Sequence, residues 1–271
     1  MTTTDYAFVT KLMLDRSALV LDPGKEYLVE TRLGPVARRH GLASPDEVIR
    51  QLQKPGADAL ATEVVEAMVT TETSFFRDVH PFETLRKTVI PELMRAREKE
   101  RRLNIWCAAS SSGQEPYTIA LLLREYFPQL AGWTVNITAT DISREMLRRA
   151  KEARYSQIEV NRGLPIALLM KHFRQDGAHW QLNDDIRARV EFRTMNLAKP
   201  WPPMPPADLI FLRNVMIYFD ADTKKRILQR MRGLLKPGGL LFLGVAETTL
   251  NLDSAYERLT AEGTSFYRAP L

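Results

Sequence analysis

Residues 103–120 hold the pattern that most limits what this chain can fold into. An apolar run at residues 103–107 predicts a buried strand, which is followed by small and hydroxylated residues, by Gly113, and by a helix-compatible stretch from Glu115. This order of strand, loop and helix is typical of nucleotide-type sites. Because glycine lets a ligand approach the main chain, Gly113 is a candidate binding residue. Such turns also serve plain packing, so the loop alone does not define a ligand.

A second expected strand, at residues 135–140, ends in Asp141. An acid at the end of the second strand of such a unit typically accepts hydrogen bonds from the two ribose hydroxyls of a nucleotide-like ligand. Asp141 or Ser143 can instead cap the helix that follows. Both interpretations of this position stay open at the level of the sequence.

Strand and helix patterns alternate from residue 103 onward. Helical stretches such as residues 220–235 separate apolar segments, and LLKPGGLLFLG at residues 234–244 gives a helix end, a turn and a strand. The expected strands are 103–107, 135–140, 190–193, 209–212 and 240–243. Residues 155–189 break the alternation, and HFRQDGAHWQLNDDIRARV predicts a small antiparallel hairpin that turns near Asp176 and Gly177.

The first seventy residues read as helical. Ser44 and Glu47 form a predicted capping box with proline at the first helical position, so a helix is expected to begin at Pro45. Pro35 should kink or restart the helix before it. The sequence thus predicts an α/β protein with a doubly wound, mostly parallel sheet, a helical N-terminal domain and a small antiparallel insert.

We expect a helical domain at residues 1–78, a charged helical linker at 79–102, and a ligand-binding domain at 103–271 with its insert at about 155–189. Residues 31–45 of the helical domain contain three arginines and no acid. A short basic stripe of this kind is most often a solvated face, and the alternative is a docking surface for an acidic helix. The arginines are Arg32, Arg38 and Arg39.

Composition narrows the class of protein further. No apolar run approaches the roughly twenty residues of a membrane span, and the start of the chain lacks a signal-peptide pattern. The single cysteine, Cys107, fits a reducing cytoplasm and is expected to be buried packing, and the four histidines lack metal-ligand spacing. The net charge is +5, but it is −3 over residues 1–75, +3 over 76–102 and +5 beyond, so it does not select nucleic acid.

Four segments together resemble one enzyme family. They are TTETSFFRD at residues 70–78, WCAASSSGQEPYTIA at 106–120, TATDIS at 138–143 and LRNVMIYF at 212–219. They resemble the CheR-type chemotaxis protein methyltransferases, which transfer a methyl group from S-adenosylmethionine to glutamates of chemoreceptors and release S-adenosylhomocysteine. The resemblance extends over residues 25–267, and it implies a class I methyltransferase fold and the methyl-accepting helices of chemoreceptor cytoplasmic domains as partners.

The resemblance also implies roles for individual residues. Arg77 and Tyr218 are the catalytic candidates, and an arginine fork suits a carboxylate acceptor. Arg77 can instead be a surface ion-pair residue, and Tyr218 a core aromatic. Thr71, Thr73, Arg77 and Glu115 are implied at the methionine end of the cofactor, Asp141 at the ribose, and Asn196, Leu197, Arg213 and Asn214 on the adenine and sulfonium side. Phe75 and Phe76 are expected to be core anchors.

The chain departs from the family pattern in three places. Gln114 stands where a second acid is common, and Val245 with Ala246 replaces a His-Ser pair, which leaves the role of Glu247 open. The hairpin is shorter than in members that dock on a receptor's C-terminal pentapeptide. We therefore expect that no such pentapeptide is required and that receptors bind through the helical domain.

Two other functions are compatible with parts of the sequence. An RNA methyltransferase would suit the sequence pI of about 9.3, but the chain has no basic stripe interleaved with exposed aromatics. A catalytically silent S-adenosylmethionine-binding adaptor in a signalling array is the other rival. The presence of both Arg77 and Tyr218 argues against it.

Overall fold

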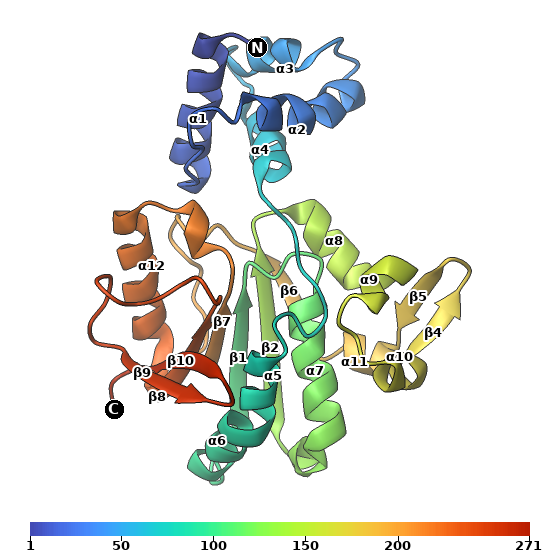
Figure 1. Cartoon of the computed structure of the whole chain (residues 1–271), viewed down its shortest axis with the longest axis vertical. Coiled ribbons are helices and arrows are strands. Elements are labelled where there is room, and N and C mark those ends of the chain that lie inside the picture. The colour runs from blue at the N-terminus through green and yellow to red at the C-terminus, as the bar shows by residue number, and fades with distance from the viewer.

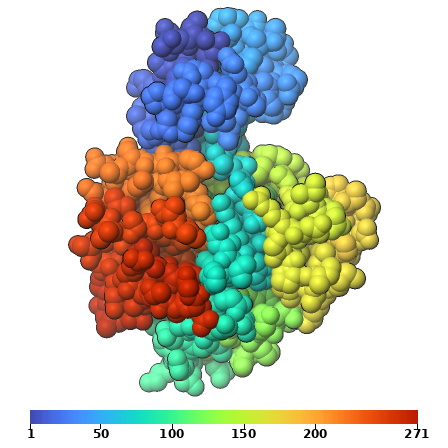
Figure 2. Space-filling view, viewed as in Figure 1, coloured from blue at the N-terminus to red at the C-terminus, as the bar shows by residue number.

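The computed structural model describes residues 1–271 and consists of a helical domain that sits over a larger α/β domain (Figure 1). The space-filling view shows the helical domain as a separate lobe above a narrow waist (Figure 2). Residues of the seventies and eighties run from this waist over the front of the larger domain, between the C-terminal strands and the insert (Figure 2). No helix in the chain combines the length and the apolar character that crossing a membrane requires.

Four helices form the N-terminal domain: α1 (Thr3–Ser17), α2 (Glu26–Arg39), α3 (Pro45–Leu52) and α4 (Asp58–Met68). Their apolar faces meet in a separate core that includes Val9, Met13 and Leu33, all fully buried. The predicted helical character of this region is confirmed. Its core is independent of the sheet, which explains why the two lobes are distinct in shape.

Two local predictions for these helices need correction. α3 begins at Pro45 and the Ser44 hydroxyl accepts the Glu47 N–H, as predicted, but the Glu47 carboxylate accepts from Ala43 (2.7 Å) and not from Ser44. The reciprocal half of the capping box is therefore wrong. The predicted restart at Pro35 is also wrong, because α2 runs through this residue as one helix.

A seven-stranded sheet organises the larger domain, in the order β6-β2-β1-β7-β8-β10-β9. The first five are parallel: β1 (Arg102–Ala108), β2 (Thr134–Asp141), β6 (Val190–Thr194), β7 (Ala207–Leu212) and β8 (Leu235–Leu243). β9 (Glu257–Ala261) and β10 (Thr264–Arg268) add an antiparallel edge. All five predicted strands are present. The chain passes outward from β1 to β6 and then returns to β7, so the direction of winding switches between β1 and β7.

Helices cover both faces of this sheet. One face packs against α7 (Gln114–Tyr126), α8 (Arg144–Glu152) and the run formed by α5 (His80–Thr84), η1 (Leu85–Val89) and α6 (Ile90–Ala96). The other face packs against α12 (Ala221–Leu234). Cys107 and Phe75 are fully buried in the first core, as predicted, and burial raises the pKa of the Cys107 thiol. This arrangement confirms the doubly wound α/β fold.

The segment expected to be a linker contributes to the same core. Phe82, Leu85 and Ile90, which lie between residues 79 and 102, are fully buried against the sheet side of the larger domain. The division of the chain at residues 78 and 102 stays a prediction. The packing of these helices favours a domain boundary closer to residue 70.

A second, three-stranded antiparallel sheet forms the insert, in the order β3-β5-β4. It consists of β3 (Arg154–Ser156), β4 (Phe173–Asp176) and β5 (His179–Leu182), with α9 (Gln157–Asn161), α10 (Ile166–His172) and α11 (Asp184–Arg187) beside it. The predicted hairpin is confirmed, and Gly177 occupies its turn with a φ of 60°. Two short 3-10 turns, η2 (Pro128–Gly132) and η3 (Met216–Tyr218), complete the fold.

Candidate functional site

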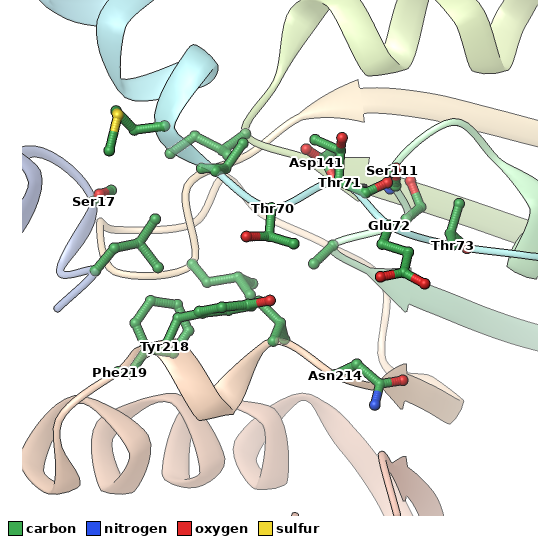
Figure 3. Close-up of a pocket in the computed structure, with 18 of the residues that line it drawn as sticks. Ser17, Thr70, Thr71, Glu72, Thr73, Ser111, Asp141, Asn214, Tyr218 and Phe219 are labelled. Atoms are coloured by element: carbon green, nitrogen blue, oxygen red, sulfur yellow. Dashed lines mark hydrogen bonds between the residues drawn. The ribbon is translucent and has the colours of Figure 1, made fainter. Parts of the chain in front are cut away.

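A cavity of about 320 Å³ lies between the helical domain and the edge of the sheet at which β1, β2 and β7 end. Its walls come from segments far apart in the sequence, including residues 17–28, 68–77, 109–115, 195–197 and 213–219. In doubly wound sheets, ligands bind outside the carboxyl ends of the strands where the winding direction switches, and this cavity is at that place. Figure 3 shows Tyr218 on one wall and the residues Thr70 to Thr73 on the wall that it faces.

The cavity brings together every candidate catalytic and cofactor residue except one. Arg77 and Tyr218, the catalytic candidates, both line it. The other predicted residues that line it are Thr71, Thr73, Glu115, Asp141, Asn196, Leu197, Arg213 and Asn214.

Gly113 is the exception, because it does not line the cavity. It precedes α7 with a φ of 92°, and an added Cβ would lie 3.0 Å from the Ala150 Cβ and 3.1 Å from the Tyr117 ring. A side chain here would crowd the contact between α7 and α8. Packing and a left-handed backbone therefore explain this glycine, and the reason inferred from the sequence, approach of a ligand, does not.

Asp141 is buried at the end of β2, and its carboxylate faces the loop after β1. Its two oxygens accept the backbone N–H groups of Ser111 (2.7 Å) and Ser143 (2.9 Å). Ser143, and not Asp141, caps α8, since its hydroxyl accepts the Met146 N–H. Each carboxylate oxygen keeps one acceptor position for a ligand. Burial raises the pKa of Asp141, although the backbone N–H bonds oppose that shift.

Arg213 connects three parts of the site. Its guanidinium bonds Glu115 on α7 (2.9 Å), the Asp78 carboxylate (2.6 Å) and the Arg77 carbonyl oxygen (2.9 Å). The side chain is only 1% exposed. Burial raises the pKa of Glu115, and the Arg213 charge acts against this. Arg213 therefore fixes the loop that carries Arg77 against the helix that carries Glu115.

The side chains of Arg77 and Tyr218 are left available. Arg77 is half-buried, donates to the Glu72 carbonyl oxygen (3.0 Å) and pairs with no carboxylate, so it is not a surface ion-pair residue. Tyr218 lies half-buried on η3 and lines the cavity, so it is not a core aromatic. The Arg77 guanidinium and the Tyr218 hydroxyl therefore line the same cavity, and neither is paired with another side chain.

Backbone strain gathers around the cavity. Eleven residues other than glycine have positive φ, and five of them lie in three of the four motif segments: Phe76, Asp78, Ala109, Ser111 and Asn214. Such conformations cost roughly 1–3 kcal/mol each and persist only where surrounding contacts impose them. Strain of this kind is concentrated at binding and catalytic sites in proteins.

The cavity wall also carries polar atoms that the protein does not satisfy. The Ser110 hydroxyl, the Arg213 Nε and the Asn214 side-chain oxygen are buried and have no hydrogen-bond partner within the chain. Buried polar groups are nearly always paired in folded proteins. Their position indicates that the cavity is built for a polar ligand.

The predicted basic stripe does not form one surface. Arg32 turns inward to the cavity wall, where it donates to the Met68 carbonyl oxygen (2.8 Å) and to the Thr70 hydroxyl (3.2 Å), and burial lowers its pKa. Arg39 pairs with Glu63 (2.6 Å). Of the three arginines, only Arg38 is exposed and without an ion pair. Arg32 belongs to the site because it lines the cavity, where it is held by the carbonyl groups at the end of α4. Nothing in the periodicity of the sequence indicates this contact.

The helical domain supplies a wall that the sequence did not reveal. Residues after α1, including Leu19 and Val20, line the cavity, and the Leu19 backbone forms a β-bridge with Phe219. Asn196 donates from its side chain to the Arg16 carbonyl oxygen (2.7 Å) across the same boundary. The site is therefore shared between both domains.

Comparison with known proteins agrees with this division. Residues 4–69 match the all-alpha domain of the CheR methyltransferases, and residues 71–264 match their S-adenosylmethionine-binding domain. The chain is 41% identical to chemotaxis protein methyltransferase 1 of Pseudomonas aeruginosa and 39% identical to chemotaxis protein methyltransferase Cher2 of Pseudomonas putida, in each case over 93% of this chain and 92% of the relative.

A third relative, the chemotaxis protein methyltransferase of Vibrio parahaemolyticus, is 34% identical over 97% of this chain and 96% of its own length. The two family matches extend over both domains and include every residue that lines the cavity except Thr70. The chain therefore belongs to the CheR family of chemotaxis protein methyltransferases, whose larger domain binds S-adenosylmethionine.

Proposed function

We propose that this protein transfers a methyl group to glutamate carboxylates on the cytoplasmic helices of chemoreceptors, and so acts as a protein-glutamate O-methyltransferase. The observation that carries the proposal is that Arg77 and Tyr218 line the same cavity as Asp141 and Glu115, and that neither side chain is bonded to another side chain. The names of the relatives support a chemotaxis substrate.

The residues of the cavity fit the cofactor. Asp141 has acceptor capacity for two ribose hydroxyls, and Glu115 places a carboxylate near Arg77 for a charged amino acid end. Thr71, Thr73, Asn196, Leu197 and Asn214 would complete its surroundings. Arg213 holds Glu115 in place through its two terminal nitrogens, and its Nε, which has no partner within the chain, is free to donate to the cofactor. When bound, S-adenosylmethionine supplies a methyl group activated by its sulfonium.

The acceptor requires no general base. A glutamate side chain has a pKa of about 4.3 and is ionised at neutral pH, so the protein must orient and desolvate it. We propose that the Arg77 guanidinium binds the acceptor carboxylate and that the Tyr218 hydroxyl donates a hydrogen bond to it. Both side chains then hold the nucleophilic oxygen in line with the methyl group. Loss of water around the carboxylate strengthens each of these contacts.

Receptor binding is assigned to the helical domain. Arg38 and Arg39 lie on its exposed surface and favour an acidic partner helix, whereas Arg32 acts within the cavity. We also propose that a receptor C-terminal pentapeptide is not required, since the β4–β5 turn is short and has one glycine, Gly177. β4 is an edge strand, so micromolar binding of free pentapeptides to it, measured by calorimetry, would overturn this part.

The experiment that tests the function is transfer of labelled methyl from S-adenosylmethionine to receptor cytoplasmic fragments. We expect label on the fragments that is released by mild base, which is the sign of a methyl ester. Label on RNA alone would replace the proposal with the RNA methyltransferase. Cofactor binding without transfer to either substrate would support the silent adaptor.

A further inference from the structure

Glu247 lies just beyond the end of β8, and its carboxylate collects four backbone N–H groups. Oε2 accepts from Gly244 (2.6 Å) and Asn214 (2.8 Å), and Oε1 accepts from Val215 (2.9 Å) and Met216 (2.7 Å). The residue is buried, with 9% of its surface exposed. Three of the four donors belong to the turn between β7 and η3, so one side chain determines the position of that turn.

This turn carries two residues of the cavity wall. Asn214 lies at its start and Tyr218 lies two residues beyond its last bonded N–H, and both line the cavity (Figure 3). Asn214 has a φ of 59°, in the left-handed region that asparagine adopts more readily than most residues. In this conformation its backbone N–H donates to the Glu247 carboxylate.

The backbone around the Glu247 carboxylate leaves room for it because residue 244 is glycine. A Cβ added to Gly244 would lie 2.7 Å from the Glu247 Oε2 and 2.8 Å from the Asn214 nitrogen. Only glycine allows this approach. An ionised carboxylate has about four acceptor positions and no donor, which matches four converging N–H groups. A glutamine of the same shape would direct an amino group at two N–H donors.

We propose that Glu247 is a positioning residue, whose carboxylate fixes the turn at residues 214–216 and thereby places Asn214 against the cofactor and Tyr218 against the acceptor. The part that concerns Tyr218 rests on the proposed function. The part that concerns Asn214 rests on cofactor binding alone. Glu247 itself does not line the cavity, so its effect is exerted through the turn.

The test compares Glu247→Gln with Asp253→Asn. Asp253 is a buried carboxylate in the same C-terminal segment, accepts the Ala255 N–H (3.1 Å), pairs with Arg232 and does not line the cavity. Amide hydrogen exchange of the peptide over residues 212–219 should be at least tenfold faster in Glu247→Gln than in wild type. It should be unchanged in Asp253→Asn, even if both variants lose thermal stability to a similar extent.

Two functional readouts accompany the exchange. Affinity for S-adenosylhomocysteine should fall by about tenfold in Glu247→Gln, the effect of losing about one hydrogen bond to a charged group. With receptor fragments, kcat should fall by more than about tenfold while KM for the receptor changes little, because Tyr218 acts on the bound acceptor. Asp253→Asn should retain wild-type values of all three.

Each outcome decides the proposal. Unchanged exchange over residues 212–219, or faster exchange with wild-type affinity and kcat, would overturn it. If the wild-type protein methylates no receptor, the proposed function fails, and exchange with S-adenosylhomocysteine affinity still decides the role of Glu247. If Glu247→Gln does not fold, Glu247→Asp, which keeps the charge but withdraws it from the turn, is measured in the same way.

Discussion

The Val20 backbone N–H donates to the Tyr218 carbonyl oxygen over 2.9 Å. With the adjacent bridge between Leu19 and Phe219, this bond joins the helical domain to the turn that carries the proposed catalytic tyrosine. Movement of the helical domain therefore displaces both a wall of the cavity and the Tyr218 backbone. This contact is the physical link between the proposed receptor-binding surface on the helical domain and the proposed chemistry in the cavity.

Val20→Pro tests the connection, because proline lacks the N–H. We expect kcat to fall by about fivefold, which corresponds to the roughly 1 kcal/mol of one hydrogen bond. Val20→Ala keeps the N–H and is the matched control, with activity near that of wild type. Steady-state kinetics with receptor fragments provides the measurement, and equal activity of the two variants would show that the bridge is dispensable.

Asp141→Asn should weaken S-adenosylhomocysteine binding by about 10- to 100-fold, since hydrogen bonds to a charged group contribute about 1.5–3 kcal/mol. Ser143→Ala is the control, because it removes only the α8 cap and should lower stability by about 1 kcal/mol with unchanged affinity. Calorimetric titration distinguishes them. Since burial raises the pKa of Asp141, wild-type affinity should begin to fall on acidification before exposed carboxylates titrate.

The elements that could be predicted from the sequence are those that depend on local patterns of apolar and turn residues. Five strands, the hairpin turn and the start of α3 followed from apolar spacing and turn residues, and they are present at the expected positions. Arg32 was misplaced because its partners, the carbonyl groups at the end of α4, are more than thirty residues away and carry no side-chain signature. The contacts of Val20 and Glu247 were invisible for the same reason, since each is made to backbone groups that any residue possesses.

Glu125 on α7 provides a test of how the insert is attached. Its carboxylate bonds Lys171 (2.8 Å) and His172 (2.7 Å) of α10, and the Lys171 bond holds the pKa of Glu125 below its ordinary value of 4.5. A lowered folded-state pKa contributes stability above pH 4.5 that is lost as the pH falls through the folded value.

Glu125→Gln should therefore lower the free energy of unfolding by about 1 kcal/mol at pH 7. The difference from wild type should narrow as the pH falls below 4.5 and the Glu125 carboxylate is protonated. Urea titrations at several pH values measure this, with Glu98→Gln, an exposed residue without an ion pair, as the control. A difference that widens as the pH falls below 4.5 would contradict the assignment.

Variants of Arg77 distinguish an effect on cofactor binding from an effect on methyl transfer. Its guanidinium is anchored by a single bond to the Glu72 carbonyl oxygen, while Arg213 fixes the Arg77 backbone through its carbonyl oxygen. Arg77→Ala should leave the loop in place and lower kcat by about 100-fold, because a misplacement of the acceptor by about 1 Å has an effect of that size. Arg77→Lys keeps the charge but cannot make two parallel hydrogen bonds, so its kcat should lie between those of wild type and Arg77→Ala.

The affinity of Arg77→Ala for S-adenosylhomocysteine, measured in parallel, should change much less than kcat. If affinity and kcat fall together, Arg77 serves the cofactor and not the acceptor, and the carboxylate-binding role would pass to another cation of the cavity wall, of which Arg32 and Lys25 are the candidates.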